Sequence, residues 1–122
     1  MAHDPKAVQI TMAAAVPDQE LLFRPMFGGI MVYAAGRPLA ALFHAGLALK
    51  MHGNAHTALL AVDGAARWQF EPKAPLSKTY IVLPDAILRD TDLLRGWILR
   101  AIAVLPPAKP KPTKRSKRRA GA

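Results

Sequence analysis

The chain has 122 residues and no cysteine, which excludes disulfides, zinc–thiolate sites and cysteine nucleophiles. Its 52% of hydrophobic residues are enough to build the core of one domain, and no apolar run reaches the ~20 residues that cross a bilayer. The formal net charge is +9, but residues 107–122 carry seven cations and no acid, so we expect a soluble, cytoplasmic domain over residues 1–106 and a disordered basic tail over residues 107–122.

The first half of the chain predicts one helix and three strands. Asp4 and Pro5 begin the helix, because a carboxylate accepts hydrogen bonds from free backbone N–H groups and the fixed φ of proline suits a first turn. This helix covers residues 6–16. Three short β-prone segments joined by glycine turns follow, which is typical of an antiparallel meander, and they are Ile30–Ala34, Pro38–Phe43 and Leu47–Met51.

The second half predicts a short helix, two strands and a longer helix. Asn54 is the expected N-cap of a helix over residues 56–62, and strands are expected over residues 67–71 and 78–83. The last helix begins at Asp90. It carries an apolar stripe at helical spacing that ends before Pro106 and consists of Leu94, Trp97, Ile98, Ala101 and Leu105.

The predicted order of elements is therefore α-β-β-β-α-β-β-α. Each amphipathic helix has to bury its apolar side, and an antiparallel sheet offers one apolar face for this purpose. The simplest architecture is an α+β fold, a two-layer α/β sandwich in which the helices cover one face of a five-stranded antiparallel sheet.

The motifs that carry common chemistries are missing or have another explanation. Gly28-Gly29 has neither the phosphate-loop nor the dinucleotide-loop spacing and precedes a strand, which favours a bulge or close packing. Ser77 and Lys78 are adjacent on a predicted strand and would point to opposite faces. His52 and His56 are four residues apart, but a glycine between them interrupts a helix, so we interpret them as exposed loop histidines. We expect no enzyme activity, no cofactor and no metal.

Three segments of the chain resemble a known family. Residues 24–33 read RPMFGGIMVY, residues 47–50 read LALK and residues 80–84 read YIVLP. In this order and spacing they resemble the N-terminal domain of TfoX/Sxy proteins, a family linked to bacterial competence regulation. Met31 departs from the pattern, because the family more often has another glycine there. The positions that carry the resemblance are Arg24, Met26, Phe27, Gly28, Gly29, Tyr33, Lys50, Tyr80 and Pro84.

The resemblance covers residues 5–105 and implies a two-layer, secretion-chaperone-like fold with a role in transcription or competence control. Arg24 and Lys50 are cations beside apolar sequence. If they share one face with Tyr33 and Tyr80, they could receive an anion or an acidic partner strand. The alternative is that each pairs with a carboxylate at the rim of the sheet.

The basic tail predicts sequence-independent, salt-sensitive affinity for nucleic acid, because cations that neutralise phosphates release counterions. The alternative is a tail that only improves solubility or binds any acidic surface. The tail has no aromatic residue on which bases could stack. Its cations are Lys109, Lys111, Lys114, Arg115, Lys117, Arg118 and Arg119.

Two functions remain open from the sequence. The first is a regulatory module that acts by protein contact, with the tail adding nucleic-acid affinity. The second is a small chaperone-like homodimer without a nucleic-acid role, whose sheet holds a partner peptide. Trp68, Phe70 and Tyr80 would line that sheet surface, and the second hypothesis loses its surface if they face the helices.

Overall fold

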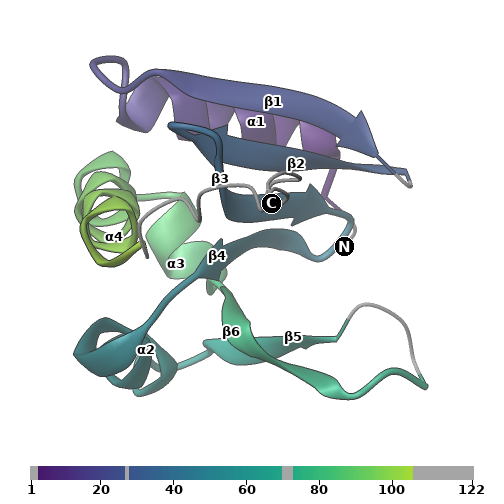
Figure 1. The fold of residues 1–122 in the computed structure, drawn as a ribbon, viewed down its shortest axis with the longest axis vertical. Coiled ribbons are helices and arrows are strands. Elements are labelled where there is room, and N and C mark those ends of the chain that lie inside the picture. Colours follow the sequence, from purple (N-terminus) through teal and green to yellow (C-terminus); the bar gives the residue numbers. More distant parts are fainter. Residues whose placement is uncertain (1–2, 27, 70–72, 106–122) are drawn as a thin grey trace, which may run out of the picture.

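An antiparallel sheet forms one layer of the structure and helices form the other (Figure 1). The computed structural model describes residues 3–26, 28–69 and 73–105, and over these ranges the sheet has six strands in the spatial order β1-β2-β3-β4-β6-β5. The predicted α+β fold class is confirmed, with six strands in place of five. The strands are β1 (Leu21–Met26), β2 (Gly29–Ala34), β3 (Arg37–Phe43), β4 (Gly46–Lys50), β5 (Ala66–Gln69) and β6 (Leu76–Val82).

The helices begin where the sequence provides side chains that cap them. Asp4 accepts a hydrogen bond from the backbone N–H of Lys6 at 3.2 Å, and Asp90 accepts one from Leu93 at 3.1 Å. These two caps confirm the predicted starts of the first and last helices. The helices are α1 (Pro5–Ala15), α2 (Gly53–Leu60), α3 (Asp85–Leu88) and α4 (Thr91–Val104).

Strand β1 is the largest departure from the prediction. Its sequence contains Arg24 and Pro25, which weaken the signal of a strand. The strand lies at the edge of the sheet and pairs only with β2 among the described strands, so Pro25 does not remove a hydrogen bond that a second neighbour would need. A strand that contains a proline is tolerated at the edge of a sheet, and for this reason the sequence pattern did not predict β1.

The region after β4 also differs from the prediction. Helix α2 begins at Gly53, three residues before the predicted start, and His52 occupies the N-cap position that was assigned to Asn54. His52 makes no side-chain capping hydrogen bond there. A further short helix, α3, begins at Asp85 directly after Pro84 and is missing from the predicted order of elements.

The core lies between the sheet and the helices. Alternate strand residues such as Val32, Leu42 and Leu49 point toward the helices and are at most 1% exposed. Each such side chain contributes about 1.5–3 kcal/mol through burial. The predicted stripe of α4 is confirmed, since Trp97 packs against the core with the buried Leu94, Ile98 and Ala101. Helix α1 contributes Val8, Met12 and Ala15 to the same core.

An ion pair holds the two long helices together at one end. The guanidinium of Arg95 on α4 donates to both carboxylate oxygens of Asp18 at 2.6 and 3.0 Å, and to the carbonyl of Ala15 at 3.2 Å. The hydrogen bond from Arg95 holds the pKa of Asp18 well below its usual range. The ion pair thereby joins α4 to the segment that follows α1. Among the described helices, none covers the opposite side of the sheet.

Candidate functional site: the open face of the sheet

The sheet face opposite the helices, called the open face below, collects side chains from all six strands. Side chains alternate between the two faces along a strand, so the neighbours of the core residues point to this side. The strand pairing places Arg24, Met31 and Ala41 in one row across β1, β2 and β3, and Ala48 of β4 continues that row. The larger side chains of the open face are Leu22, Arg24, Met26, Met31, Tyr33, Phe43, Lys50, Trp68, Lys78 and Tyr80.

The open face carries an aromatic cluster. The ring of Trp68 on β5 lies 5.1 Å from that of Phe43 on β3 and 5.5 Å from that of Tyr80 on β6. Strands separated by two others lie about 14 Å apart in a flat sheet, so the rings of Trp68 and Phe43 meet by reaching across β4 and β6. Ala48 on β4, between these strands, has a small side chain and no exposed surface.

Tyr33 and Tyr80 also lie on this face, although their strands are not adjacent. Burial raises the pKa of the Tyr80 hydroxyl, and the nearby Tyr33 raises it further. Lys50 stands directly opposite Tyr80 in the pairing of β4 with β6. The structure thus places Arg24, Lys50 and both tyrosines on one face, with β2 and β3 between the strands of the two cations.

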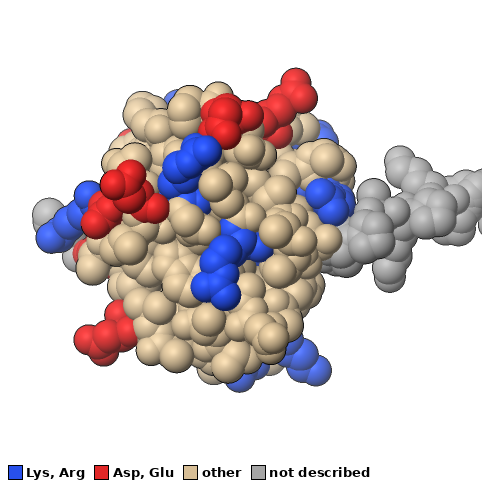
Figure 2. All heavy atoms as spheres, turned by 90° about the vertical axis from the view of Figure 1, so that its left-hand side faces the viewer, with Lys and Arg blue, Asp and Glu red and all other residues tan. Residues whose placement is uncertain are grey.

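The strands carry charges of one sign only. The six strand sequences contain no aspartate or glutamate. No carboxylate of the described residues lies within 4.0 Å of the charged groups of Arg24, Lys50 or Lys78. By contrast, basic and acidic side chains are intermixed on the side where α2 and α4 lie (Figure 2). The cations of the strands are Arg24, Arg37, Lys50, Arg67 and Lys78.

Two of these cations have structural roles. Arg37 donates to the carbonyl of Leu105 at 3.3 Å, which holds the end of α4. Arg67 donates to the carbonyls of Ser77 at 2.9 Å and Leu76 at 3.3 Å, which ties β5 to β6. The cations that remain for binding are those of the open face.

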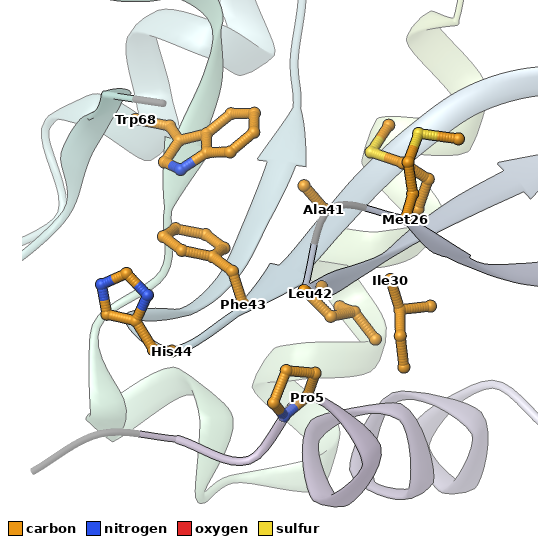
Figure 3. Close-up of a pocket in the computed structure, with 11 residues that line it drawn as sticks. Pro5, Met26, Ile30, Ala41, Leu42, Phe43, His44 and Trp68 are labelled. Carbon is orange, nitrogen blue, oxygen red and sulfur yellow. The ribbon is translucent and has the colours of Figure 1, made fainter. Parts of the chain in front are cut away.

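A pocket of about 220 Å³ opens beside the turn between β1 and β2. In Figure 3 the rings of Trp68 and Phe43 lie on one side of the pocket and Met26 on the other, with Pro5 of α1 toward the helix layer. The lining is apolar apart from His44 and backbone groups. The residues that line it are Pro5, Met26, Gly28, Gly29, Ile30, Met31, Ala41, Leu42, Phe43, His44 and Trp68.

The two adjacent glycines serve this region in different ways. Gly28 has φ +79°, a left-handed conformation that other residues rarely adopt. At Gly29 a side chain would place its Cβ 2.5 Å from the carbonyl oxygen of Leu42 on β3. Gly29 therefore allows β2 and β3 to approach closely, which confirms the close-packing interpretation for Gly29, whereas the space around Gly28 is open.

The remaining chemical candidates are engaged in the fold. The hydroxyl oxygen of Ser77 accepts hydrogen bonds from the backbone N–H groups of Tyr80 at 2.9 Å and Thr79 at 3.2 Å. It therefore acts within its own strand, β6, and not with Lys78. Over residues 3–26, 28–69 and 73–105, no three His, Cys, Asp or Glu side chains come close enough to hold a metal.

The interpretation of His52 and His56 as exposed loop residues is wrong. Both are half-buried at the start of α2, and within the described residues the Nε2 atom of each is buried without a hydrogen-bond partner. Burial lowers the pKa of His52, and the nearby Lys50 and His56 lower it further. The predicted break in the helix was misplaced, since Gly53 is its first residue.

Other predicted site residues lie elsewhere. Pro84 is the N-cap residue of α3 and its ring approaches Gly64, so its role is structural. Phe27, Phe70 and the cations of the tail lie outside the described residues. Sequence reasoning missed Phe43, although its position next to the core residue Leu42 on a predicted strand would have placed it on the open face.

The comparisons with known proteins bear on the whole described domain. Residues 14–105 match the family model of the TfoX N-terminal domain. No curated protein and no solved structure matches the chain. Within the ranges that the structure describes, none of the helices combines the length and apolar character that crossing a membrane requires.

Proposed function

Because this chain belongs to the TfoX N-terminal domain family, we propose that it is a non-enzymatic regulatory module that acts in the cytoplasm by protein contact. The observation that carries the proposal is the open face, which combines the aromatic cluster of Phe43, Trp68 and Tyr80 with cations and no acidic strand residue. Aromatic residues and arginine are enriched where proteins bind one another. A regulator needs such a surface and does not need a catalytic group.

The charge of the open face defines the partner. Arg24, Lys50 and Lys78 have no carboxylate within ion-pair distance among the described residues. Complementary charge speeds the encounter of two proteins and selects against partners of the same charge. The open face therefore suits an acidic segment of a protein partner that also carries apolar side chains.

Site-specific photo-cross-linking in the host cell tests the proposal. A photoreactive phenylalanine replaces Leu22, which is 56% exposed on the open face, or Ile10, which is 71% exposed on α1. We expect a discrete adduct from position 22 and not from position 10. Lys50→Glu should abolish this adduct because it reverses the charge of the surface, whereas Lys6→Glu makes the same charge change on α1 and should leave it intact.

Peptide mapping of the adduct identifies the segment of the partner that binds the open face. A cross-linked segment rich in aspartate and glutamate supports the proposal. Equal adducts from positions 10 and 22, or an adduct that survives Lys50→Glu, would contradict it.

The basic tail adds the second part of the proposal, a non-specific affinity for nucleic acid. Seven cations that contact phosphates give a salt slope of at most about 6 for duplex DNA. The test is fluorescence anisotropy with a labelled duplex over a salt series, for the full chain and for a chain that ends at Leu105. We expect binding only by the full chain. Equal binding by both would move the nucleic-acid site to the folded domain.

A chaperone-like homodimer without a nucleic-acid role is the second candidate function. It is favoured by the position of Trp68 and Tyr80, which lie on the open face and do not face the helices. In this case the cross-link from position 22 joins two copies of the chain. Analytical ultracentrifugation would then show a dimer that Trp68→Ser weakens.

A further inference from the structure

The apolar pocket at the edge of the open face lies within reach of any segment bound there. Met26 on β1 lines the pocket, and Arg24 is two residues earlier on the same strand and the same face. Two residues along a strand span about 7 Å, so the cation and the pocket have the spacing of alternate side chains in an extended peptide.

The size of the pocket suits one side chain. Its volume is about 220 Å³. Sites for whole drug-sized molecules measure about 300–1,000 Å³, whereas an apolar cavity of about 150 Å³ in another protein already binds benzene. The pocket therefore has room for a leucine or phenylalanine side chain and not for a whole cofactor.

The lining of the pocket selects an apolar group. Trp68 and Phe43 provide ring surfaces, and Met26 and Met31 provide flexible thioether side chains that adapt to groups of different shape. The imidazole of His44 belongs to an exposed residue. A polar side chain that entered the pocket would lose its hydration against a mainly apolar lining.

We propose that this pocket receives one leucine-sized or phenylalanine-sized side chain of an extended acidic segment of a partner protein, with an acidic residue of that segment two positions away against Arg24. This inference rests on the proposed function, because the cations of the open face define the acidic character of the segment. It adds the anchor that would give the contact its specificity, since buried apolar anchors contribute most of the energy of many interfaces.

The methionines of the chain allow a direct test with the full-length protein. Met26 and Met31 line the pocket, whereas Met12 and Met51 are fully buried in the helix-covered core and serve as internal controls. The probes are capped acidic heptapeptides with glutamates two positions before and after a central leucine, phenylalanine or alanine. The protein is labelled with ¹³C at the methionine methyl groups and titrated with each peptide.

We expect the leucine and phenylalanine peptides to shift the methyl signals of Met26 and Met31 and to leave those of Met12 and Met51 in place. The alanine peptide should bind about tenfold more weakly, because it buries less apolar surface in the pocket. Equal affinities for all three peptides would overturn the inference.

A matched pair of variants separates the pocket from the rest of the face. Met26→Gln changes an exposed residue that lines the pocket, and Leu22→Gln changes an exposed residue on the same strand and face that does not. We expect Met26→Gln to remove the preference for leucine over alanine and Leu22→Gln to keep it. The thermal midpoints of both variants confirm that each is folded.

The two proposals can fail separately. If the peptides bind with equal affinity and Lys50→Glu abolishes their binding, the pocket inference fails and the proposed function stands. If the leucine peptide does not bind at all, the pocket inference also fails, and the photo-cross-link from position 22 decides the proposed function on its own.

Discussion

The two faces of the sheet are built from the same strands and differ in almost every property. On β4, Leu49 faces the helices and has no exposed surface, whereas the next residue, Lys50, faces the open side opposite Tyr80. On β3, Leu42 is 1% exposed and belongs to the core, whereas the half-buried Phe43 contacts Trp68 on the open face. Alternation along each strand thus separates the residues that stabilise the fold from those that are available for binding.

This separation has a physical consequence for how each face tolerates change. Side chains in the covered face are closely packed between two layers, so the loss of a few atoms leaves a cavity. Side chains of the open face, such as Met31 and Tyr33, are only half-buried and can rearrange. We therefore expect stability to depend mainly on the covered face and binding mainly on the open face.

The largest expected effect is on the covered face. Leu49→Ala should lower the free energy of unfolding by about 3 kcal/mol, because it leaves a cavity between the sheet and the helices. Met31→Ala, a truncation on the open face, should cost about 1 kcal/mol, because its side chain is already partly in water. Urea unfolding of both variants measures the difference, and equal losses would show that the open face is packed like the core.

Gly29→Ala should have the next largest effect. Its Cβ would lie 2.5 Å from the carbonyl oxygen of Leu42, a backbone atom that cannot move without separating β2 from β3. We expect a loss of about 2 kcal/mol in the free energy of unfolding. Because Gly29 also lines the pocket, this variant should bind the leucine heptapeptide more weakly even where it remains folded.

Gly28→Ala should cost less, about 1 kcal/mol, because the space around Gly28 is open and only the left-handed backbone opposes a side chain. Gly28→Asn should be tolerated better than Gly28→Ala, since asparagine adopts this conformation more readily. Thermal unfolding of the two variants tests whether backbone conformation is what limits substitution at Gly28. If Gly28→Asn lowered the stability as much as Gly29→Ala does, the space for a side chain, and not backbone conformation, would limit substitution at both glycines.

The sequence predicted the features that depend on neighbouring residues. The caps at Asp4 and Asp90 and the stripe of α4 are local patterns, and the structure has all of them. Strand β1 was missed because its identity depends on pairing with β2, and a proline is compatible with an edge strand only once that position is known. The start of α2 at Gly53 contradicts local propensity in the same way.

The candidate site, too, was predictable only where it depends on neighbouring residues in the sequence. Arg24, Lys50, Tyr33 and Tyr80 could be named from the sequence, but whether they share a face depends on strand order and register. The contact of Trp68 with Phe43 joins strands that are not neighbours in the sheet, so no local pattern encodes it. The pocket is lined by residues of β1, β2, β3 and β5, so it could be found only in the structure.

The cations of the open face should contribute little to stability. Arg24→Ala and Lys50→Ala should each change the free energy of unfolding by less than about 0.5 kcal/mol, since surface substitutions without a partner have small effects. Both substitutions should nevertheless weaken the binding of the acidic heptapeptides, and the size of this effect should depend on the salt concentration. Urea unfolding and peptide titration at two salt concentrations provide the comparison, and a large loss of stability at either position would assign that cation to the fold.

The smallest expected effect concerns pH and involves His52, where the two faces meet at the end of β4. Burial holds its pKa below the ordinary value of 6.5, and Lys50 and His56 act in the same direction. Arg100 of α4 lies along the same hollow and is a further cation near it. Above pH 6.5 both the folded and the unfolded chain carry a neutral imidazole at this position, so its contribution to stability is complete there.

Below pH 6.5 the unfolded chain binds a proton at His52 before the folded chain does, so the free energy of unfolding falls as the pH falls and levels off below the folded pKa. His52→Gln removes this titration and should make stability less dependent on pH between 7.5 and 5.5. Urea unfolding at several pH values measures the pH dependence of stability for the unaltered chain and for the variant, and His44→Gln, on an exposed turn, controls for the loss of a histidine as such. If His52→Gln keeps the full pH dependence, His52 is not the group that makes the stability sensitive to acid.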